Sequence, residues 1–187
     1  YGMDALIVAA RYGTFRMVLK LLASGANVKT KDCKNKTALE WSRDLDNYSR
    51  KKEIEEAILE RMNQLLILAA SNGQYAEVCD LLKLGASANS KESTSGISAL
   101  MLAAGKGYAD IVRALLGGGA NVNEKDRAKV TALMRAAEEG HIDVVRVLLA
   151  QWANVNDKDK DGLTALMVAL RNGHVDVCLM LQEAGAK

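Results

Sequence analysis

Short apolar stripes with helical spacing recur along the chain, and each is followed by a glycine and a second apolar run. In one copy, Thr131 opens the segment Thr-Ala-Leu-Met-Arg-Ala-Ala-Glu-Glu-Gly. Its leucine and alanines predict a helix with one apolar face that begins at the threonine cap and ends at the glycine. The next run, 142–149, is apolar over too wide an arc for a surface helix. It predicts a second helix covered by neighbours on both sides.

This pattern repeats with a fixed period. Thr131 and Thr164 lie 33 positions apart, and Ser98 lies 33 positions before Thr131. The segments between units, such as 123–130 and 156–163, are polar and rich in turn-forming residues, as expected of projecting hairpins. A period of this length indicates a solenoid of stacked helix pairs.

The units resemble the ankyrin repeat family, whose phrases T-P-L-H-x-A-A-x-x-G-H and L-L-x-x-G-A-x-V-N match most of the chain. Alanine replaces the family's proline, which keeps helix propensity but loses a preset φ. Methionine replaces its histidine at Met101, Met134 and Met167. The resemblance implies an all-α, ankyrin-repeat solenoid with projecting hairpin loops. We expect six helix pairs, at about 4–23, 37–60, 64–83, 98–117, 131–150 and 164–183.

The register breaks near residue 61. The third unit starts at Gln64, only 27 positions after Thr37, and no hairpin precedes it. Residues 37–61 resemble the polar unit that closes ankyrin arrays, whereas Met62 begins a segment that resembles an opening unit. We therefore expect two parts: residues 1–61, two ankyrin-type units ending in a closing-type repeat, and residues 62–187, four units beginning with an opening-type repeat.

Three arrangements fit this break. In the first, one face of a continuous helix crosses residues 61 and 62, and residues 1–61 complete the array of another copy, giving a swapped homo-oligomer. In the others, two stacks pack directly, or the chain kinks at a shortened loop. The chain also starts like the middle of an array and stops before any closing unit, which indicates a permuted order. The expected helix face consists of Ile54, Ile58, Met62, Leu65 and Ala69.

Composition narrows the function classes. The 187 residues include 25 basic and 23 acidic ones, so no strong overall field attracts nucleic acid or a membrane. Apolar runs such as 65–70 are far shorter than a membrane span. We therefore expect a cytoplasmic protein without nucleic-acid or membrane partners. Three cysteines without a paired spacing indicate reduced thiols, and Cys79 and Cys178 lie in apolar runs typical of packing.

No catalytic arrangement is recognisable. His141 and His174 occupy the Gly-His step of the repeat, where the resemblance implies a structural role, and no third metal ligand accompanies them. Residues 117–119 are three glycines that end a helix, whereas a phosphate-binding loop would open one. We therefore expect no enzyme activity, no cofactor and no metal site.

The resemblance implies a protein–protein interaction scaffold that binds its partner on the concave face of hairpin tips and first helices. Two alternatives remain open: a self-assembling oligomer, domain-swapped or engineered, and a regulatory or targeting module of a larger enzyme. Ile97, Val130 and Leu163 recur on the hairpins, where they serve either packing or partner contact. The full expected face consists of Ile97, Lys106, Tyr108, Lys125, Arg127, Val130, Glu138, Glu139, Lys158, Lys160, Asp161, Leu163, Arg171 and Asn172.

Trp152 stands where other units have glycine, for example Gly119 and Gly185. If the backbone there is left-handed, a non-glycine residue costs roughly 1–2 kcal/mol. Either the indole contacts a partner or a neighbouring chain, or the helix end relaxes and the indole lies on its own repeat. Trp41, by contrast, is expected to pack inside its helix.

The hairpin after the first unit is the most basic local segment. Its lysines surround Asp32 and Cys33, and no aromatic residue lies between them in the sequence. A solvated hairpin is the simpler interpretation, and a site for an acidic partner is the alternative. The lysines are Lys29, Lys31, Lys34 and Lys36.

Overall fold

The computed structural model describes residues 4–45 and 47–186, so residues 1–3 of the expected first part lie outside it. The described residues form eleven helices and one isolated antiparallel bridge, between Lys91 and Ser98. They divide into two compact units. Unit 1 comprises Tyr1–Leu65 and Leu84–Ala86, and unit 2 comprises Leu66–Lys83 and Ser87–Lys187.

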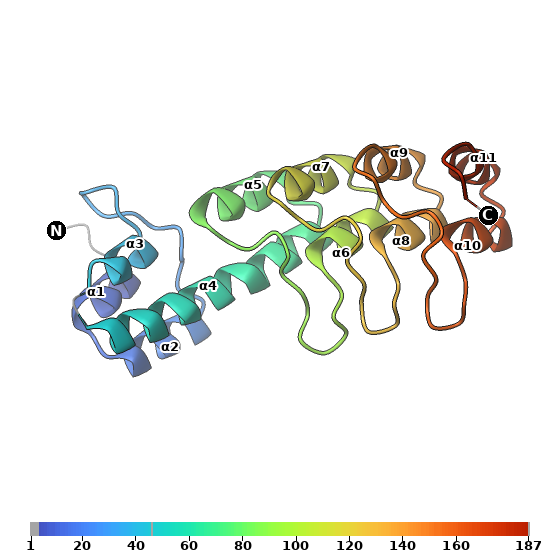
Figure 1. The fold of residues 1–187 in the computed structure, drawn as a ribbon. Coiled ribbons are helices and arrows are strands. Elements are labelled where there is room, and N and C mark those ends of the chain that lie inside the picture. The colour runs from blue at the N-terminus through green and yellow to red at the C-terminus, as the bar shows by residue number, and fades with distance from the viewer. Residues whose placement is uncertain (1–3, 46, 187) are drawn as a thin grey trace. The chain divides into compact units, whose positions relative to one another are not determined.

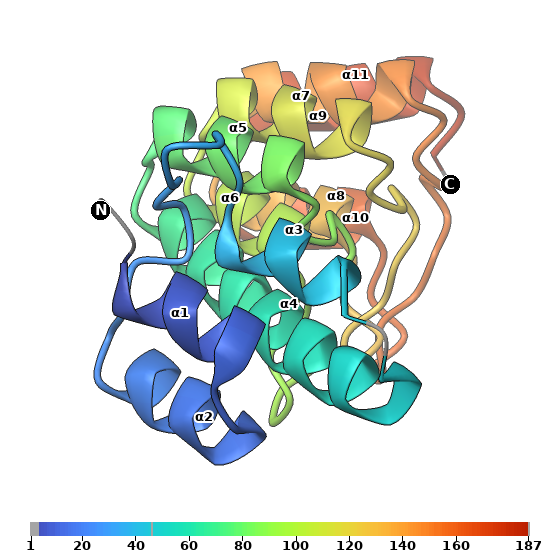
Figure 2. The same cartoon turned by 90° about the vertical axis from the view of Figure 1, so that its left-hand side faces the viewer.

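Unit 2 is a stack of helix pairs in two layers (Figures 1 and 2). The first helices α6, α8 and α10 contact one another in turn, as do the second helices α7, α9 and α11. The hairpins that join successive pairs project from the same side in Figure 1. The first helices are α6 (Ala99–Gly105), α8 (Ala132–Glu138) and α10 (Ala165–Arg171). The second helices are α5 (Tyr75–Leu84), α7 (Ala109–Gly117), α9 (Ile142–Ala150) and α11 (Val175–Glu183).

The predicted caps begin the first helices. The hydroxyl of Thr131 accepts a 3.3 Å hydrogen bond from the backbone N–H of Met134, and Ser98 and Thr164 do the same for their own helices. At Thr131 the cap is reciprocal, because the Met134 sulfur lies 3.5 Å from the Thr131 N–H. The methionine that replaces the family's histidine therefore satisfies a backbone donor that the helix leaves unpaired.

Asparagine side chains join successive repeats of unit 2. Asn123 accepts a 2.8 Å hydrogen bond from the Asn154 N–H and donates a 3.3 Å bond to the Trp152 carbonyl. Asn89 makes the same pair of bonds to Asn121 and Gly119 one repeat earlier. Each asparagine thus fixes the end of the next repeat's second helix.

Unit 1 packs two helix pairs around its own apolar core. The helices are α1 (Ala5–Tyr12), α2 (Phe15–Ala23), α3 (Ala38–Arg43) and the first part of α4 (Tyr48–Ser71). The Arg50 guanidinium of α4 donates to the Gly13 carbonyl after α1. The largest fully buried side chains of this unit are Leu6, Ile7, Ile54, Ile58 and Met62.

Helix α4 runs without a break across residues 61 and 62, so the hypothesis of a continuous helix there is confirmed. It serves as the second helix of the pair expected at 37–60 and as the first helix of the pair expected at 64–83. The described chain therefore has eleven helices, not the twelve that six separate pairs require. The expected buried face was wrong at Leu65, which is only half-buried. Leu66 is fully buried instead, because it continues the four-residue step from Met62.

Candidate partner-binding site

A groove on the first-helix side of unit 2 brings together four of the predicted partner-binding residues. Ile97 comes from a hairpin, Lys106 ends α6, and Glu138 and Glu139 end α8. The groove has a volume of about 180 Å³. Sequence reasoning missed its remaining lining residues, which are Met101, Leu102, Gly105 and Arg135.

The absence of a side chain at Gly105 helps to keep this groove open. A Cβ atom added there would lie 3.6 Å from the Arg135 Cβ, an ordinary contact distance. The Arg135 guanidinium donates a 3.0 Å hydrogen bond to the buried Asp126 carboxylate, which fixes the position of the Arg135 side chain. Its Nε is buried and has no hydrogen-bond partner among the described residues. The groove therefore has an apolar floor with charges of both signs at its rim.

Asp126 organises the hairpin beside the groove. Its Oδ1 accepts hydrogen bonds of 2.8 and 2.9 Å from the backbone N–H groups of Ala128 and Val130. Asp159 does the same for Asp161 and Leu163 one repeat later. Val130 and Leu163, like Ile97, are half-buried, so part of each side chain packs and part faces solvent.

The basic hairpin residues lie along the same side of unit 2. Lys125 is exposed but forms a 2.8 Å ion pair with Asp157 of the next repeat. Arg127 donates a 2.7 Å hydrogen bond to the Ser93 carbonyl of the preceding hairpin. Lys158, Lys160 and Asp161 are exposed.

The remaining predicted residues lie near turns between helices. Asn172 donates a 3.0 Å hydrogen bond to the Glu138 carbonyl, and the neighbouring Arg171 is exposed. Tyr108 lies at the turn between α6 and α7, where a Cβ at Gly73 would come within 2.9 Å of its ring. His141 occupies the same place one repeat later, and its Nε2 lies 3.2 Å from the Gly105 carbonyl. Tyr108 is therefore placed as an inter-repeat packing residue.

Trp152 has the left-handed backbone that its position predicts, with a φ of 63°. Its side chain is 87% exposed, so the interpretation in which the indole lies on its own repeat is wrong. Beside it is a shallow hollow of about 650 Å³ whose lining includes Leu149, Val155 and Ala184. Asn123 donates a hydrogen bond to the Trp152 carbonyl, as Asn89 and Asn156 do to the glycines Gly119 and Gly185 at this repeat position.

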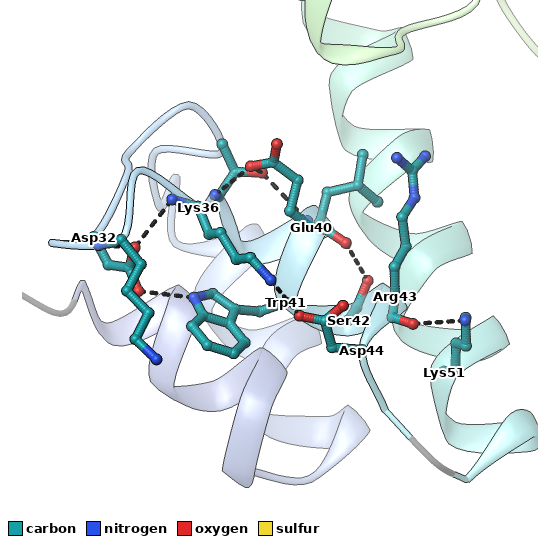
Figure 3. A network of polar contacts seen from close by, with 11 residues as sticks. Asp32, Lys36, Glu40, Trp41, Ser42, Arg43, Asp44 and Lys51 are labelled. Atoms are coloured by element: carbon teal, nitrogen blue, oxygen red, sulfur yellow. Dashed lines mark hydrogen bonds and ion pairs between the residues drawn. The ribbon is translucent and has the colours of Figure 1, made fainter.

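Unit 1 carries a cluster of polar contacts around Trp41 (Figure 3), and three basic groups lie against the ring of this tryptophan. Trp41 is only 7% exposed, and its indole donates a 2.8 Å hydrogen bond to Asp32. The Arg11 guanidinium lies 3.9 Å from the ring centroid, and the ammonium groups of Lys36 and Lys34 lie at 4.7 and 5.5 Å. The expectation that Trp41 packs is confirmed. The fold also places its ring next to Lys34 and Lys36, although no aromatic residue lies among these lysines in the sequence.

Carboxylates in this cluster are stabilised in their ionised form. The Lys36 backbone N–H, together with the Trp41 and Lys34 donors, lowers the pKa of Asp32 below its ordinary value despite its burial. The hydrogen bond from the Thr37 backbone N–H lowers the pKa of Glu40, and the Lys36 ammonium lowers that of Asp44. In unit 2, the bond from the Lys91 ammonium lowers the pKa of Glu124.

Other classes of site are not apparent in the described ranges. Within residues 4–45 and 47–186, no three His, Cys, Asp or Glu side chains come together as a metal ion requires. None of the helices described there has both the length and the apolar character needed to cross a membrane. Cys178 is buried, Cys79 is half-buried and Cys33 is exposed, and all three are free thiols.

The stacked pairs, their caps and their projecting hairpins agree with a comparison against known families. A model for ankyrin repeats, in three copies, matches residues 66–159 and 129–187. No curated protein matches the chain. The matched residues span more than half of the sequence and include every helix pair that forms the groove. The chain belongs to the ankyrin repeat family.

Proposed function

We propose that this chain is a protein–protein interaction module that binds a segment of another protein across the hairpins and first helices of unit 2. Ankyrin repeats generally act as such modules. The observation that carries the proposal is the groove of about 180 Å³ between α6 and α8, which unites Ile97, Lys106, Glu138 and Glu139.

The lining of the groove defines the chemistry of the partner. Ile97, Met101 and Leu102 offer an apolar floor, and Lys106 and Glu139 place opposite charges at the rim. A partner segment with one apolar side chain flanked by polar or charged residues fits this surface. Such a segment would bind without strong dependence on its net charge.

The exposed residues of the following hairpins extend the proposed face. Lys158, Lys160 and Asp161 are free of the inter-repeat ion pair that holds Lys125, and they lie on the hairpin next to Arg127. Arg171 and Asn172 continue this face at the end of α10. We propose that these residues set the preference among partner segments, because contacts at a solvated rim tune specificity more than affinity.

Trp152 supports a second contact. Large exposed aromatic side chains are enriched where proteins meet, and this one is retained at a cost in backbone strain. We propose that the partner, or a neighbouring chain, covers the indole. Replacing Trp152 with glycine would then weaken association, and unchanged or stronger association would refute the contact.

The groove is tested by filling it with a larger side chain at residue 105. Peptides that bind the whole chain are selected from a displayed random library, and their affinities are then measured against Gly105→Leu. The matched control is Gly117→Leu, since a Cβ at Gly117 meets nothing within 4 Å. The proposal expects Gly105→Leu to lose binding at least tenfold, which corresponds to about 1.4 kcal/mol, and Gly117→Leu to retain it.

A second arm tests the rim. Reversing the charges of Lys158 and Lys160 with glutamate is expected to change which peptides bind and to leave the loss caused by Gly105→Leu in place. Peptides that bind Gly105→Leu as tightly as the unmodified chain would contradict the groove as the binding site.

We also propose that the chain consists of two ankyrin arrays, residues 1–61 and residues 62–187, and that neither is catalytic. The division into two compact units near residue 65 supports the boundary. A cytoplasmic location is part of this proposal, since free thiols are usual there. Urea unfolding tests this division, because Trp41 fluorescence reports residues 1–61 and circular dichroism reports the whole chain. Two arrays that fold separately are expected to give transitions at different urea concentrations.

A further inference from the structure

The basic cluster of unit 1, which consists of Arg11, Lys34 and Lys36, draws its charges from two elements. Lys34 and Lys36 belong to the hairpin before α3, whereas Arg11 belongs to α1. Their charged groups lie 5.5, 4.7 and 3.9 Å from the Trp41 ring centroid, with Arg11 the nearest. Exposed lysines on a hairpin are ordinary, but a solvated hairpin does not account for an arginine that a separate helix places against the same ring. The fold therefore gathers more positive charge here than the hairpin provides.

Two of the three charges have no carboxylate partner among the residues that the structure describes. The Lys36 ammonium forms a 2.5 Å ion pair with Asp44. The buried Asp32 carboxylate already accepts two backbone N–H groups and an indole N–H. In the described ranges, the Arg11 guanidinium and the Lys34 ammonium form neither an ion pair nor a hydrogen bond. Both groups can therefore still bind an anion.

These two unpaired charges lie close enough to act together. The Arg11 guanidinium and the Lys34 ammonium lie 3.9 and 5.5 Å from one ring centroid, so less than the Debye length of about 10 Å at 0.1 M salt separates them. Salt screens them from each other only in part, and they repel. An anion near both groups offsets this repulsion and is attracted by both charges.

The surroundings of Arg11 favour a carboxylate as the anion. Its guanidinium carbon lies 4.7 Å from the Tyr12 ring centroid as well as 3.9 Å from that of Trp41. A guanidinium that stacks on aromatic rings keeps the N–H groups at its edge, and these form a planar fork that fits the two oxygens of a carboxylate. The Trp41 ring is buried, so it holds the arginine and offers no surface on which a base could stack.

The same repeat positions are occupied differently in unit 2. Counted from the caps of their helices, Arg11 and Trp41 correspond to Gly105 and Arg135, which line the groove. The two lysines of the hairpin correspond to an alanine and a valine before α8. Unit 2 thus has a groove with an apolar floor at the place where unit 1 has an arginine stacked on an indole. The two units therefore offer surfaces of different chemistry.

We propose that the basic cluster binds a carboxylate side chain in an acidic segment of a partner protein. Arg11 and Lys34 supply the direct contacts, and Lys36 adds positive charge while it stays paired with Asp44. The cluster lies in unit 1, so the proposal does not depend on the groove of unit 2.

A peptide fits the surroundings of the cluster better than a nucleic acid does. The exposed carboxylates of Glu40 and Asp44 lie near Lys36 (Figure 3). A nucleic-acid strand carries a phosphate about every 3.4 Å, so a strand that reaches the cluster brings further phosphates toward these carboxylates. A peptide can present one acidic side chain to Arg11 and Lys34 and place neutral residues opposite Glu40 and Asp44.

The test measures the binding of the whole chain to three fluorescent probes by anisotropy. The first probe is a peptide in which glutamate alternates with serine, and the second has glutamine in place of each glutamate. The third is a single-stranded oligothymidine with as many negative charges as the first. The unmodified chain is expected to bind the glutamate peptide, with an affinity that falls as salt is added, and not to bind the glutamine peptide.

Paired substitutions locate the site. The double variant Arg11→Gln/Lys34→Gln is expected to lower the affinity for the glutamate peptide about tenfold or more. The matched control is Arg16→Gln/Lys20→Gln, which removes the same two residue types from exposed positions of α2 and should retain the affinity. Circular dichroism verifies that both variants fold. Because Arg11 packs on an indole, Lys34→Glu is measured as well, since it changes only an exposed lysine and should also weaken binding.

The groove variant Gly105→Leu separates this proposal from that for unit 2. It is expected to bind the glutamate peptide as tightly as the unmodified chain does.

Three outcomes would overturn the proposal. An unmodified chain that does not bind the glutamate peptide even in low salt has no such site. Equal losses in the two double variants would mean that the peptide is attracted by net charge alone. Tighter binding of the oligothymidine, abolished by Arg11→Gln/Lys34→Gln, would assign the cluster to nucleic acid instead.

Discussion

The Oδ2 of Asp32 accepts a 2.8 Å hydrogen bond from the indole N–H of Trp41, nine residues further along the chain. Asp126 and Arg135 make the corresponding bond at 3.0 Å with the same spacing. In both hairpins the other carboxylate oxygen accepts backbone N–H groups two and four residues later. One buried aspartate therefore ties each hairpin to the helix that follows, through tryptophan in unit 1 and arginine in unit 2.

Unit 1 is expected to lose stability in acid through Asp32. The pKa of Asp32 is lowered in the folded chain, whereas in the unfolded chain it is near the ordinary value of about 3.9. The ionised carboxylate thus stabilises the fold above that pH, and the contribution is lost as the pH falls through the folded pKa. Asp32→Asn is expected to flatten the dependence of the free energy of unfolding on pH in this acid range.

Trp41 provides the measurement for this prediction. It is 7% exposed and the other tryptophan is 87% exposed, so in a Trp152→Phe background the fluorescence reports unit 1 alone. Urea unfolding is followed at a series of pH values. Asp161→Asn, at an exposed aspartate of unit 2, is the control and should leave the curve unchanged. Equal acid sensitivity of Asp32→Asn and the unmodified chain would contradict the role of this carboxylate.

Trp152→Gly is expected to raise the free energy of unfolding by about 0.5–1 kcal/mol. Removing a left-handed non-glycine residue gains roughly 1–2 kcal/mol, and the greater backbone freedom of glycine in the unfolded chain offsets part of it. Gln151→Gly is the matched control, because Gln151 has a φ of −103° and gains no such relief. In thermal and urea unfolding, Trp152→Gly should raise the free energy of unfolding, and Gln151→Gly should lower it. A loss of stability for Trp152→Gly would contradict the cost assigned to the left-handed backbone at this position.

Asn123→Ala is expected to lower the free energy of unfolding by about 1–2 kcal/mol. The change removes two hydrogen bonds between repeats, to the Asn154 N–H and the Trp152 carbonyl, each worth about 0.5–1.5 kcal/mol. Asn27→Ala is the comparison, since the Asn27 side chain accepts one 2.9 Å bond from Lys29 within its own loop. Urea unfolding followed by circular dichroism should give the larger loss for Asn123→Ala.

Gly105→Ala is expected to raise the free energy of unfolding by about 0.5–1 kcal/mol, the usual gain from replacing a helical glycine. The new methyl group would meet Arg135 at 3.6 Å, so it fits without displacement. The same variant narrows the groove, so we expect it to lower the affinity of the peptides that were selected against the unmodified chain. The free energy of unfolding measured by calorimetry should therefore rise, and the peptide affinity measured by titration should fall. A destabilised Gly105→Ala would show that the methyl group disturbs Arg135 and its bond to Asp126.

The repeat pattern predicted the local features that depend on one residue type. Caps at Thr131 and Thr164 and the left-handed backbone at Trp152 followed from the side chain and its position alone. A continuous helix across residues 61 and 62 was one of the three arrangements that the sequence allowed, because no hairpin precedes Gln64, and α4 has this arrangement. Its buried face was misplaced by one residue at Leu65, where the apolar run 65–70 leaves the helical phase ambiguous.

The candidate site was predicted less completely, because it depends on how neighbouring repeats approach. Met101, Leu102 and Arg135 line the groove only because α6 and α8 lie side by side, and no pattern within one repeat contains that information. A signal for Asp126 did exist. Asp32, Asp126 and Asp159 each stand five positions before the threonine cap of the next helix.

The Asn123 bridge also limits how this protein can change length. Its two hydrogen bonds reach only the adjacent repeat, as does the Lys125 ion pair with Asp157. Duplication or loss of one complete repeat would leave every such bond with an equivalent partner. An insertion within a second helix of the stack would instead move one member of such a pair away from the other. Gain or loss of whole repeats is therefore the change in length that preserves these bonds throughout unit 2.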